Sequence, residues 1–361
     1  MTDYEVELID DESKFLALSD IWNELLSQNE INTFFLRFEW MKNWWQSFGA
    51  DHSLFILIAR EKNAQATSAK DKANVVGIAP LMRSKQKKIE FIGTGLADYA
   101  DFIISSGKEE VLCAFVDYLF SHRSRWNEIG LLEIPRKSSS IDLLGSLLKK
   151  HTNTSIIRQT VPCASLDLQS SKSEEIDALL KKKDLRRHIK FFEQSGAFSF
   201  QKVENIDSAL SLLELFFEQH ISIWQRRDQP SMFLDKRYKE FFKNLTKDLL
   251  ASKEVTIWSM HQDEKLVAMQ FGFEYRGSYI TYCQSYDLEF AKHSPATVLY
   301  KLFIEQYRKQ GLAIVDFSRG SESYKSRFSN AKTVNMKVMV YKNPMKYHLL
   351  RLYYGFKKIA M

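Results

Sequence analysis

The order of predicted elements occurs twice along the chain, and this repetition constrains the fold more than any other feature. In the first half, the strands LFILIAR (54–60) and VVGIAPLM (75–82) precede a short strand, a helix and the strand GLLEIP (130–135). In the second half, VTIWSMH, LVAMQFGFEY and SYITYC precede a helix and the strand LAIVDF. The two series lie about 180 to 200 residues apart. A repeated unit as long as a domain indicates the duplication of one α/β domain and argues against a solenoid.

The order within each half also predicts the type of sheet. Three strands, a helix and a further strand are typical of a mixed sheet in which the helix crosses over between neighbouring strands. We therefore predict an α/β (α+β) fold of two similar domains, each a mostly antiparallel mixed sheet flanked by helices. The polar stretch LQSSKSEE marks the boundary, so the first lobe covers residues 1–165 and the second 173–342. Residues 62–74 are predicted to form the long tip of a hairpin, and residues 343–361 a basic amphipathic tail.

Composition limits the class of protein. Of the 361 residues, 45% are apolar and 13% aromatic, which is enough for one or two packed cores, and the segment TFFLRFEWMKNWW is predicted to lie in one of them. A net charge of +6 is compatible with anionic ligands but is not typical of a nucleic-acid-binding tail. Cys113, Cys163 and Cys283 have no metal-ligand or disulfide spacing, so we predict buried thiols, no metal and a reducing compartment. No apolar run is long enough to span a membrane, and we expect a cytoplasmic protein.

The most informative stretch runs from residue 285 to residue 328. Ser294 is predicted to cap a helix whose first residue is Pro295, because proline has no N–H to leave unpaired there. The strand LAIVDF follows this helix. Polar side chains crowd the carboxyl end of that strand: Asp316, Arg319, Glu322, Tyr324, Lys325 and Arg327. The free N–H groups of a helix start beside such a strand end can hold a pyrophosphate next to a reacting group.

Several motifs carry a resemblance to a known family. They are TFFLRFEWMKNWW and GIAPL in the first half, and LRRHIKFFEQSG, HISIWQRR, SYDLEFAKHSPATVL and DFSRGSESYKSRF in the second. Together with the order of elements, they resemble tandem GNAT N-acyltransferases named after a cellulose-biosynthesis acetyltransferase, which are related to the Fem-type peptidyltransferases. The resemblance covers nearly the whole chain. It implies transfer of an acyl group from coenzyme A to an amine, in many members within exopolysaccharide or envelope pathways.

The resemblance also implies where the acyl-CoA donor binds. The backbone N–H groups of Ala296, Thr297 and Val298, with Ser294 before them, would hold the pyrophosphate. Arg319 is a further candidate for binding the anionic donor. The sequence departs from the family here, because the glycine-rich phosphate loop is absent and Ala296 stands where such proteins have the glycine of SPG. The alanine methyl group reduces the room for close approach of the phosphates.

Four residues are candidates for the chemistry. His220, in HISIWQRR, is either a general base or a core histidine, and Asp287 either orients the acceptor amine or closes a turn. Lys325 resembles the active-site lysine of an aromatic-Lys motif in Fem-type enzymes and could stabilise an oxyanion; its alternative is a solvated lysine. Tyr324 could donate a proton to the leaving thiolate. No nucleophile-elbow motif is present, which favours direct transfer without an acyl-enzyme intermediate.

These observations lead to one principal prediction and two alternatives. The chain is predicted to be an acyl-CoA-dependent N-acyltransferase acting on an amino sugar or a similar envelope precursor. The first alternative is a Fem-like transferase using aminoacyl-tRNA, indicated by the basic run between Lys181 and Lys190, which is otherwise a solvated helical face. The second is a non-catalytic binding module. The tail either rests on the inner face of an anionic membrane or packs on the protein.

Overall fold

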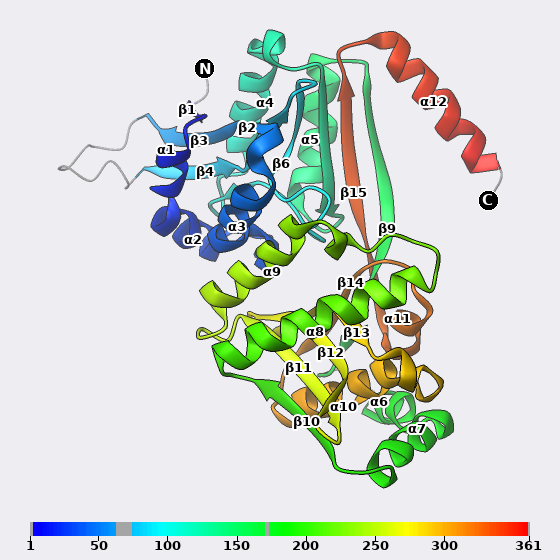
Figure 1. Cartoon of the computed structure of the whole chain (residues 1–361). Coiled ribbons are helices and arrows are strands. Elements are labelled where there is room, and N and C mark those ends of the chain that lie inside the picture. The colour runs from blue at the N-terminus through cyan, green and yellow to red at the C-terminus, as the bar shows by residue number, and fades with distance from the viewer. Residues whose placement is uncertain (1–2, 63–73, 170–172, 360–361) are drawn as a thin grey trace. The chain divides into compact units, whose positions relative to one another are not determined.

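The computed structural model describes residues 3–62, 74–169 and 173–359, so the predicted hairpin tip at 62–74 lies almost wholly outside the described residues. The chain forms two compact units (Figure 1): residues 1–160 with 334–361, and residues 161–333. It passes from the first unit to the second within β9 (Ser155–Asp167) and returns within β15 (Ala331–Tyr341). The second unit is therefore inserted into the first.

The first unit contains two sets of paired strands. One has the order β1-β3-β4-β7, and in the other β15 is followed by β8, β6, β5 and β2. Helices α4 and α5 pack against each other (Figure 1), and α4 also packs on β1, β3 and β4. The aromatic segment predicted to be core is buried, with Phe34, Phe35 and Trp40 at 0% exposed. In chain order the remaining elements are β1 (Tyr4–Ile9), α1 (Glu12–Leu16), α2 (Ser19–Gln28), α3 (Phe38–Phe48), β2 (His52–Leu54), β3 (Ile56–Glu61), β4 (Val75–Ala79), β5 (Leu81–Ser84), β6 (Lys88–Phe91), β7 (Ile103–Ile104), α4 (Val111–Ser121), β8 (Glu128–Pro135), α5 (Ser139–His151) and α12 (Pro344–Ile359).

The second unit has the strand order β10-β11-β12-β13-β14-β9. Its pairs are antiparallel except β13 with β14, which run parallel because α10 crosses over between them. Leu299, Phe303 and Tyr307, on one face of that helix, are buried in the core. In chain order the elements are α6 (Ser173–Leu180), α7 (Lys183–Gln194), β10 (Phe198–Val203), α8 (Ile206–Gln225), η4 (Met232–Leu234), α9 (Lys236–Leu249), β11 (Val255–Gln262), β12 (Lys265–Tyr275), β13 (Ser278–Tyr286), η5 (Leu288–His293), α10 (Pro295–Lys309), β14 (Ile314–Arg319) and α11 (Ser323–Phe328).

The two units repeat an unusual local feature. Each has a parallel pair, β6 with β8 and β13 with β14, and in each the strand after the crossover helix is irregular. Glu133 in β8 has φ +61° and Ser318 in β14 has φ +60°, a left-handed conformation that costs free energy for residues other than glycine. The ladders of both strands shift register close by. The same distortion at the same position in both units is the structural form of the predicted repeat.

The division of the chain differs from the predicted lobes at β15 and at the tail, because residues 334–361 all belong to the first unit. The sequence pattern assigns the strand ending at residue 342 to the second lobe, but residues 334–341 lie in the first unit. There they pair with β8, and Met336, Val338 and Val340 fill the first unit's core. Periodicity identifies this segment as a strand, but it carries no information about a partner some 200 residues earlier in the chain.

Candidate functional site

The strands β13 and β14 separate toward their carboxyl ends. Their parallel pairing covers only Ser278–Ile280 against 314–316, after which β14 pairs with β9 alone. A bulge between the Phe271 and Gly272 pairs bends β13 next to this point. Gly272 is required there, because a Cβ atom would lie 2.5 Å from the Ile280 carbonyl oxygen. Beyond the last pair, one hydrogen bond of 3.0 Å from the Ser318 hydroxyl to the Thr281 carbonyl connects the two strands.

A pocket of about 200 Å³ lies at the carboxyl end of β13, beside the start of α10. It brings together four residues predicted from the sequence, namely Ser294, Ala296, Thr297 and Tyr324. The other residues that line it are Gln284, Tyr286, Ala291, Pro295 and Tyr300. Strand alternation could have identified the pair at 284 and 286, because residues two apart share a face of a strand. Tyr300, four residues after Ala296, shares a face of α10 with it by the same kind of argument.

The start of α10 leaves one of the three predicted N–H donors free. Ser294 adopts a left-handed conformation with φ 48° and ψ 52°. Its carbonyl oxygen accepts hydrogen bonds from Thr297 N–H (2.9 Å) and Val298 N–H (3.1 Å). Among the described residues, no partner is found for Ala296 N–H, and Pro295 has no N–H. The Val298 side chain is fully buried in the core. A bound anion would therefore meet Ala296 N–H first, with the Thr297 hydroxyl beside it.

Two tyrosines form the polar wall of the pocket. The Tyr300 and Tyr324 rings lie 5.1 Å apart between centroids, and their hydroxyls share a hydrogen bond. Burial raises the pKa of Tyr324 well above its usual range, and the neighbouring Tyr300 adds to the increase. Burial raises the pKa of Tyr300 in the same way. Both phenols therefore keep their protons at neutral pH, and both hydroxyl groups belong to the polar lining of the pocket.

The pocket also contains an unsatisfied acceptor. Gln284 Oε1 is buried and has no hydrogen-bond partner among the described residues. A buried amide oxygen without a partner costs free energy, and a bound ligand with an N–H or O–H group would recover it. Gln284 comes from β13, whereas the free Ala296 N–H comes from α10. The pocket therefore offers an acceptor, a backbone donor and a protonated phenol from three different elements.

Lys325 and Arg319 do not line this pocket. The Lys325 ammonium group donates to the Arg319 carbonyl oxygen and lies 3.1 Å from Glu322 Oε2, and the residue is only 5% exposed. These contacts close the turn between β14 and α11 around Gly320, which has φ +135°. A Cβ atom on Gly320 would lie 2.6 Å from Lys325 Nζ, so the turn depends on glycine. In this arrangement Lys325 holds the loop that precedes Tyr324.

Asp287 lies in a neighbouring pocket of about 420 Å³. Its carboxylate accepts from Glu289 N–H at 2.8 Å and is 2.8 Å from Lys265 Nζ. Acidic and amide side chains share this pocket with it, including Glu218, Gln219 and Glu264. Tyr286 lines both pockets, so the two are adjacent. Asp287 therefore stabilises a turn through its hydrogen bond to Glu289 N–H, and it also lines a polar pocket next to the first one.

His220 lies in neither pocket. It is buried between α8 and η4, with its ring stacked on Trp224 and edge-on to Phe233. The Ser231 hydroxyl oxygen accepts a hydrogen bond from Phe233 N–H. The Ser231 hydroxyl group can in turn donate to His220 Nδ1 at 2.8 Å, and a neutral imidazole can accept this bond. Burial, together with the nearby charge of Arg227, lowers the pKa of His220 to about 4. These contacts match the core-histidine alternative.

His220→Gln is expected to flatten the pH dependence of stability. The unfolded chain binds a proton at His220 with a pKa near 6.5 and the folded chain only near 4, so stability falls as pH is lowered through this window. The parent protein should lose about 3 kcal/mol of unfolding free energy from this site between pH 7 and pH 4, and the variant should not. Urea unfolding at a series of pH values measures the difference. His348→Gln, at an exposed position, is the matched control, and parallel curves for His220→Gln and the parent would contradict the assignment.

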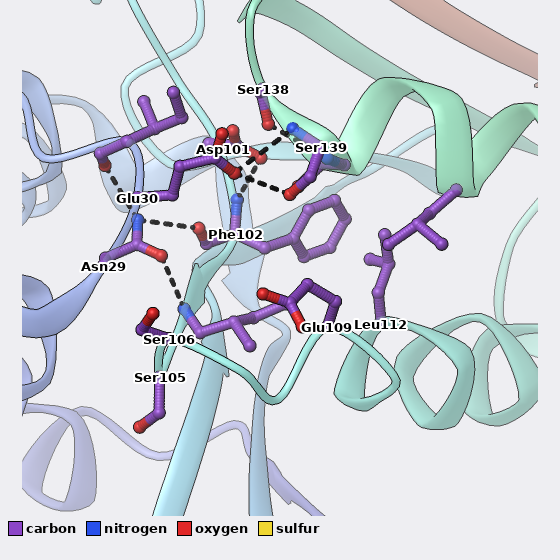
Figure 2. Close-up of a pocket in the computed structure, with 14 residues that line it drawn as sticks. Asn29, Glu30, Asp101, Phe102, Ser105, Ser106, Glu109, Leu112, Ser138 and Ser139 are labelled. Carbon is purple, nitrogen blue, oxygen red and sulfur yellow. Dashed lines mark hydrogen bonds between the residues drawn. The ribbon is translucent and has the colours of Figure 1, made fainter.

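The first unit has a pocket at the equivalent place, with different chemistry. This pocket lies at the start of α4, which follows β7, and at the start of α5, which follows β8 (Figure 2). The pocket in the second unit likewise lies at the start of α10 and next to α11, which follows β14. Figure 2 shows Glu30 and Asp101 beside Ser138 and Ser139. Glu30 Oε2 accepts from the Ser139 hydroxyl at 2.6 Å, and Asp101 accepts from Phe102 N–H at 2.8 Å.

The carboxylates make this first pocket unsuitable for an anion. Burial raises the pKa of Asp101 to about 6, against the hydrogen bonds from Ser138 and Ser140 that lower it. At neutral pH Asp101 therefore carries negative charge, and a carboxylate in this position would repel a phosphate group. Of these two pockets, only the one in the second unit has no aspartate or glutamate among the residues that line it.

Residues 181–326 match the family model described as Acetyltransferase (GNAT) domain. This segment is therefore similar to GNAT domains. It contains the pocket at the start of α10, and the family is one of transferases. No curated protein sequence matches the chain. Among the described residues, no group of three or more His, Cys, Asp or Glu side chains is placed to hold a metal ion.

Solved structures with the same fold cover both units. FemX has a TM-score of 0.63 at 10% identity, with 96% of this chain and 99% of that chain aligned. A conserved protein of unknown function from Bacteroides thetaiotaomicron has a TM-score of 0.57 at 13% identity, covering 94% and 100%. L-PGS from Bacillus licheniformis has a TM-score of 0.52 at 13% identity, covering 94% and 96%. At such identities the likeness concerns the fold. The predicted fold class, an α/β (α+β) tandem of GNAT-like domains, is confirmed.

Proposed function

We propose that this protein is an acyl-CoA-dependent N-acyltransferase that acts on the amino group of an amino sugar or another cell-envelope or exopolysaccharide precursor. The observation that carries the proposal is the buried, protonated Tyr324 phenol in the pocket beside the start of α10, inside the GNAT domain. A neutral phenol there can donate a hydrogen bond to the thioester sulfur and give its proton to the thiolate that leaves in thioester aminolysis.

The proposed reaction is a direct transfer. The neutral amine attacks the thioester carbonyl carbon, a C–N bond forms and the C–S bond breaks. The amine nitrogen releases one proton to solvent, and Tyr324 gives its proton to the coenzyme A thiolate. Tyr324 then recovers a proton from solvent, so the products are the amide and the free thiol. Positioned proton donation of this kind contributes about 10²- to 10⁴-fold to a rate.

Donor binding is proposed at the start of α10. The free Ala296 N–H and the helix dipole favour an anionic pyrophosphate at this end of the helix. Lys292 and His293 come directly before the turn in the chain and are basic residues. Thr297 and Ser294 line the pocket and supply hydroxyl groups. The acyl-CoA would therefore be bound by one backbone N–H group and several side chains in place of a glycine-rich loop.

The acceptor is proposed to occupy the neighbouring pocket. Glu218 and Asp287 supply carboxylates, and Gln219 and Ser222 supply neutral polar groups. Carboxylates attract a protonated amine on approach, and polar neutral groups suit the hydroxyls of a sugar. Gln284 Oε1, in the adjoining pocket, is an acceptor for the amine N–H at the moment of attack.

A second candidate function is a Fem-like transferase that uses aminoacyl-tRNA. The observations in its favour are the fold likeness to FemX over both units and the basic helix α7. Helix α7 is not uniformly basic, because it contains Asp184, which pairs with Arg327 at 2.8 Å. A non-catalytic binding module is the third alternative, and it would bind ligands in the same pocket without turnover.

Calorimetric titration and thiol release separate these functions. We expect acetyl-CoA to bind the purified chain, and release of the coenzyme A thiol to accelerate when D-glucosamine is added as a probe acceptor. A panel of amino sugars and longer acyl-CoAs extends the test. Filter binding with aminoacyl-tRNA is expected to show no specific complex. Absence of acetyl-CoA binding at millimolar concentration, with a specific aminoacyl-tRNA complex, would overturn the proposal in favour of the Fem-like alternative.

A further inference from the structure

Helix α12 is fixed to the first unit by its first turn. Asn343 caps it by accepting from Met345 N–H at 2.9 Å, and Pro344 occupies the first helical position. Tyr347 is only 8% exposed and anchors the turn. The Lys346 ammonium group pairs with the Glu128 carboxylate of β8. The helix therefore starts at a defined position after β15 (Figure 1).

The rest of the described helix exposes an apolar face. Met345, Leu349, Leu352 and Tyr353 are 73%, 69%, 60% and 53% exposed. Positions i, i+4, i+7 and i+8 share one face of an α-helix, so these side chains form a single stripe opposite the anchoring Tyr347. The other exposed large hydrophobic residues of the described chain lie singly on other elements: Leu16, Val161, Leu215, Leu234 and Ile314. Scattered apolar residues are ordinary on a protein surface, but a continuous stripe indicates a binding surface.

The charged residues of the segment that carries this stripe are all basic. Residues 342–361 contain five lysines and arginines and no aspartate or glutamate. Lys346 lies at the edge of the stripe on the helix, and Lys342 lies just before the helix begins. Two copies of this helix would bring like charges together, whereas an anionic surface would be attracted to it. Charge complementarity therefore favours an anionic partner over a second copy of the chain.

We propose that α12 binds the interface of an anionic lipid bilayer, with Met345, Leu349, Leu352 and Tyr353 inserted among the acyl chains and the basic residues at the headgroups. An apolar face with basic flanks is the composition of helices that lie in the plane of a membrane surface. Among the described residues, no helix is long and apolar enough to cross a membrane. The proposal does not depend on the reaction in the second unit.

Vesicle sedimentation with the full chain tests this binding. The expected result is that the protein sediments with vesicles of phosphatidylcholine and phosphatidylglycerol, and at least about tenfold less with phosphatidylcholine alone or at high salt. The double variant Leu349→Glu/Leu352→Glu should lose at least about tenfold in binding, because two apolar contacts are replaced by repelled charges. Both positions are exposed, so the variant should fold normally, which circular dichroism checks.

The control places the same change elsewhere. Leu234→Glu, at a position 58% exposed outside α12, should leave vesicle binding unchanged. Equal binding by the double variant and the parent would overturn the proposal, as would failure of the parent to bind anionic vesicles. Concentration-dependent dimerisation without lipid, removed by the double variant, would also overturn it and would identify a second copy of the chain as the occupant of the stripe.

Discussion

Tyr324→Phe is expected to lower kcat for acyl transfer by about 10²- to 10³-fold, with little change in the affinity for acetyl-CoA. The substitution keeps the ring, which lies 5.1 Å from that of Tyr300, and removes only the hydroxyl that would protonate the thiolate. The free energy of unfolding should fall by about 1 kcal/mol, because one hydrogen bond with Tyr300 is lost. Thiol release under saturating substrates and calorimetric titration of acetyl-CoA measure the two effects separately.

A tyrosine outside the pockets provides the control for this experiment. Tyr238→Phe, at a half-buried position on α9 that lines neither of the two pockets, should leave kcat within a factor of about two, since substitutions away from the reacting groups have small effects on the rate. A Tyr324→Phe variant as fast as the parent would exclude the phenol as the proton donor. Equal losses of kcat and of unfolding free energy in both variants would instead indicate a general effect of removing a hydroxyl.

Ala296→Glu is expected to weaken acetyl-CoA binding by about 10- to 100-fold while stabilising the free protein slightly. A carboxylate at the second position of α10 interacts favourably with the helix dipole, by about 0.3 to 1 kcal/mol. The same carboxylate would stand beside the N–H that is proposed to meet the pyrophosphate, and repulsion between such charges a few ångströms apart costs about 1 to 4 kcal/mol. Calorimetric titration gives the loss of affinity, and urea unfolding gives the gain in stability.

Two further variants show whether position 296 is special. Ser208→Glu adds the same charge to the exposed first turn of α8, and it should change stability similarly without affecting acetyl-CoA binding. Ala296→Gly removes the methyl group, and it should tighten acetyl-CoA binding modestly at a cost of up to about 1 kcal/mol in helix stability. If Ala296→Glu bound acetyl-CoA as well as the parent, the donor would have to bind elsewhere.

The repeated order of elements and the helix start at Pro295 could both be predicted from the sequence. They depend on local signals, namely alternation of apolar residues, a capping residue and proline at the first helical position. Four of the nine predicted site residues line the pocket, and three of them lie within four residues at that helix start, where the sequence signal is strongest.

The remaining site residues depend on contacts that a single sequence does not show. Alternation places Gln284 and Tyr286 on one face of a strand, but it does not show that the partner strand leaves after Ile280. Lys325 stands next to Tyr324 in the sequence, but on a helix neighbouring side chains point in different directions, and its ammonium group is taken up by the Arg319 carbonyl. His220 fits both a catalytic motif and a core position, and burial among aromatic rings distinguishes the two.

Because the second unit is inserted into the first, the unit whose synthesis begins first is not the unit that can complete its folding first. Residues 161–333 are continuous in the chain, so all strands and helices of that unit are available once residue 333 has left the ribosome. The first unit begins earlier but needs β15, whose Met336, Val338 and Val340 complete its core. Until those residues emerge, β8 keeps an unpaired edge on the side that β15 will occupy. The unit made first is thus the last that can close, and during translation it is the one exposed to premature pairing with other chains.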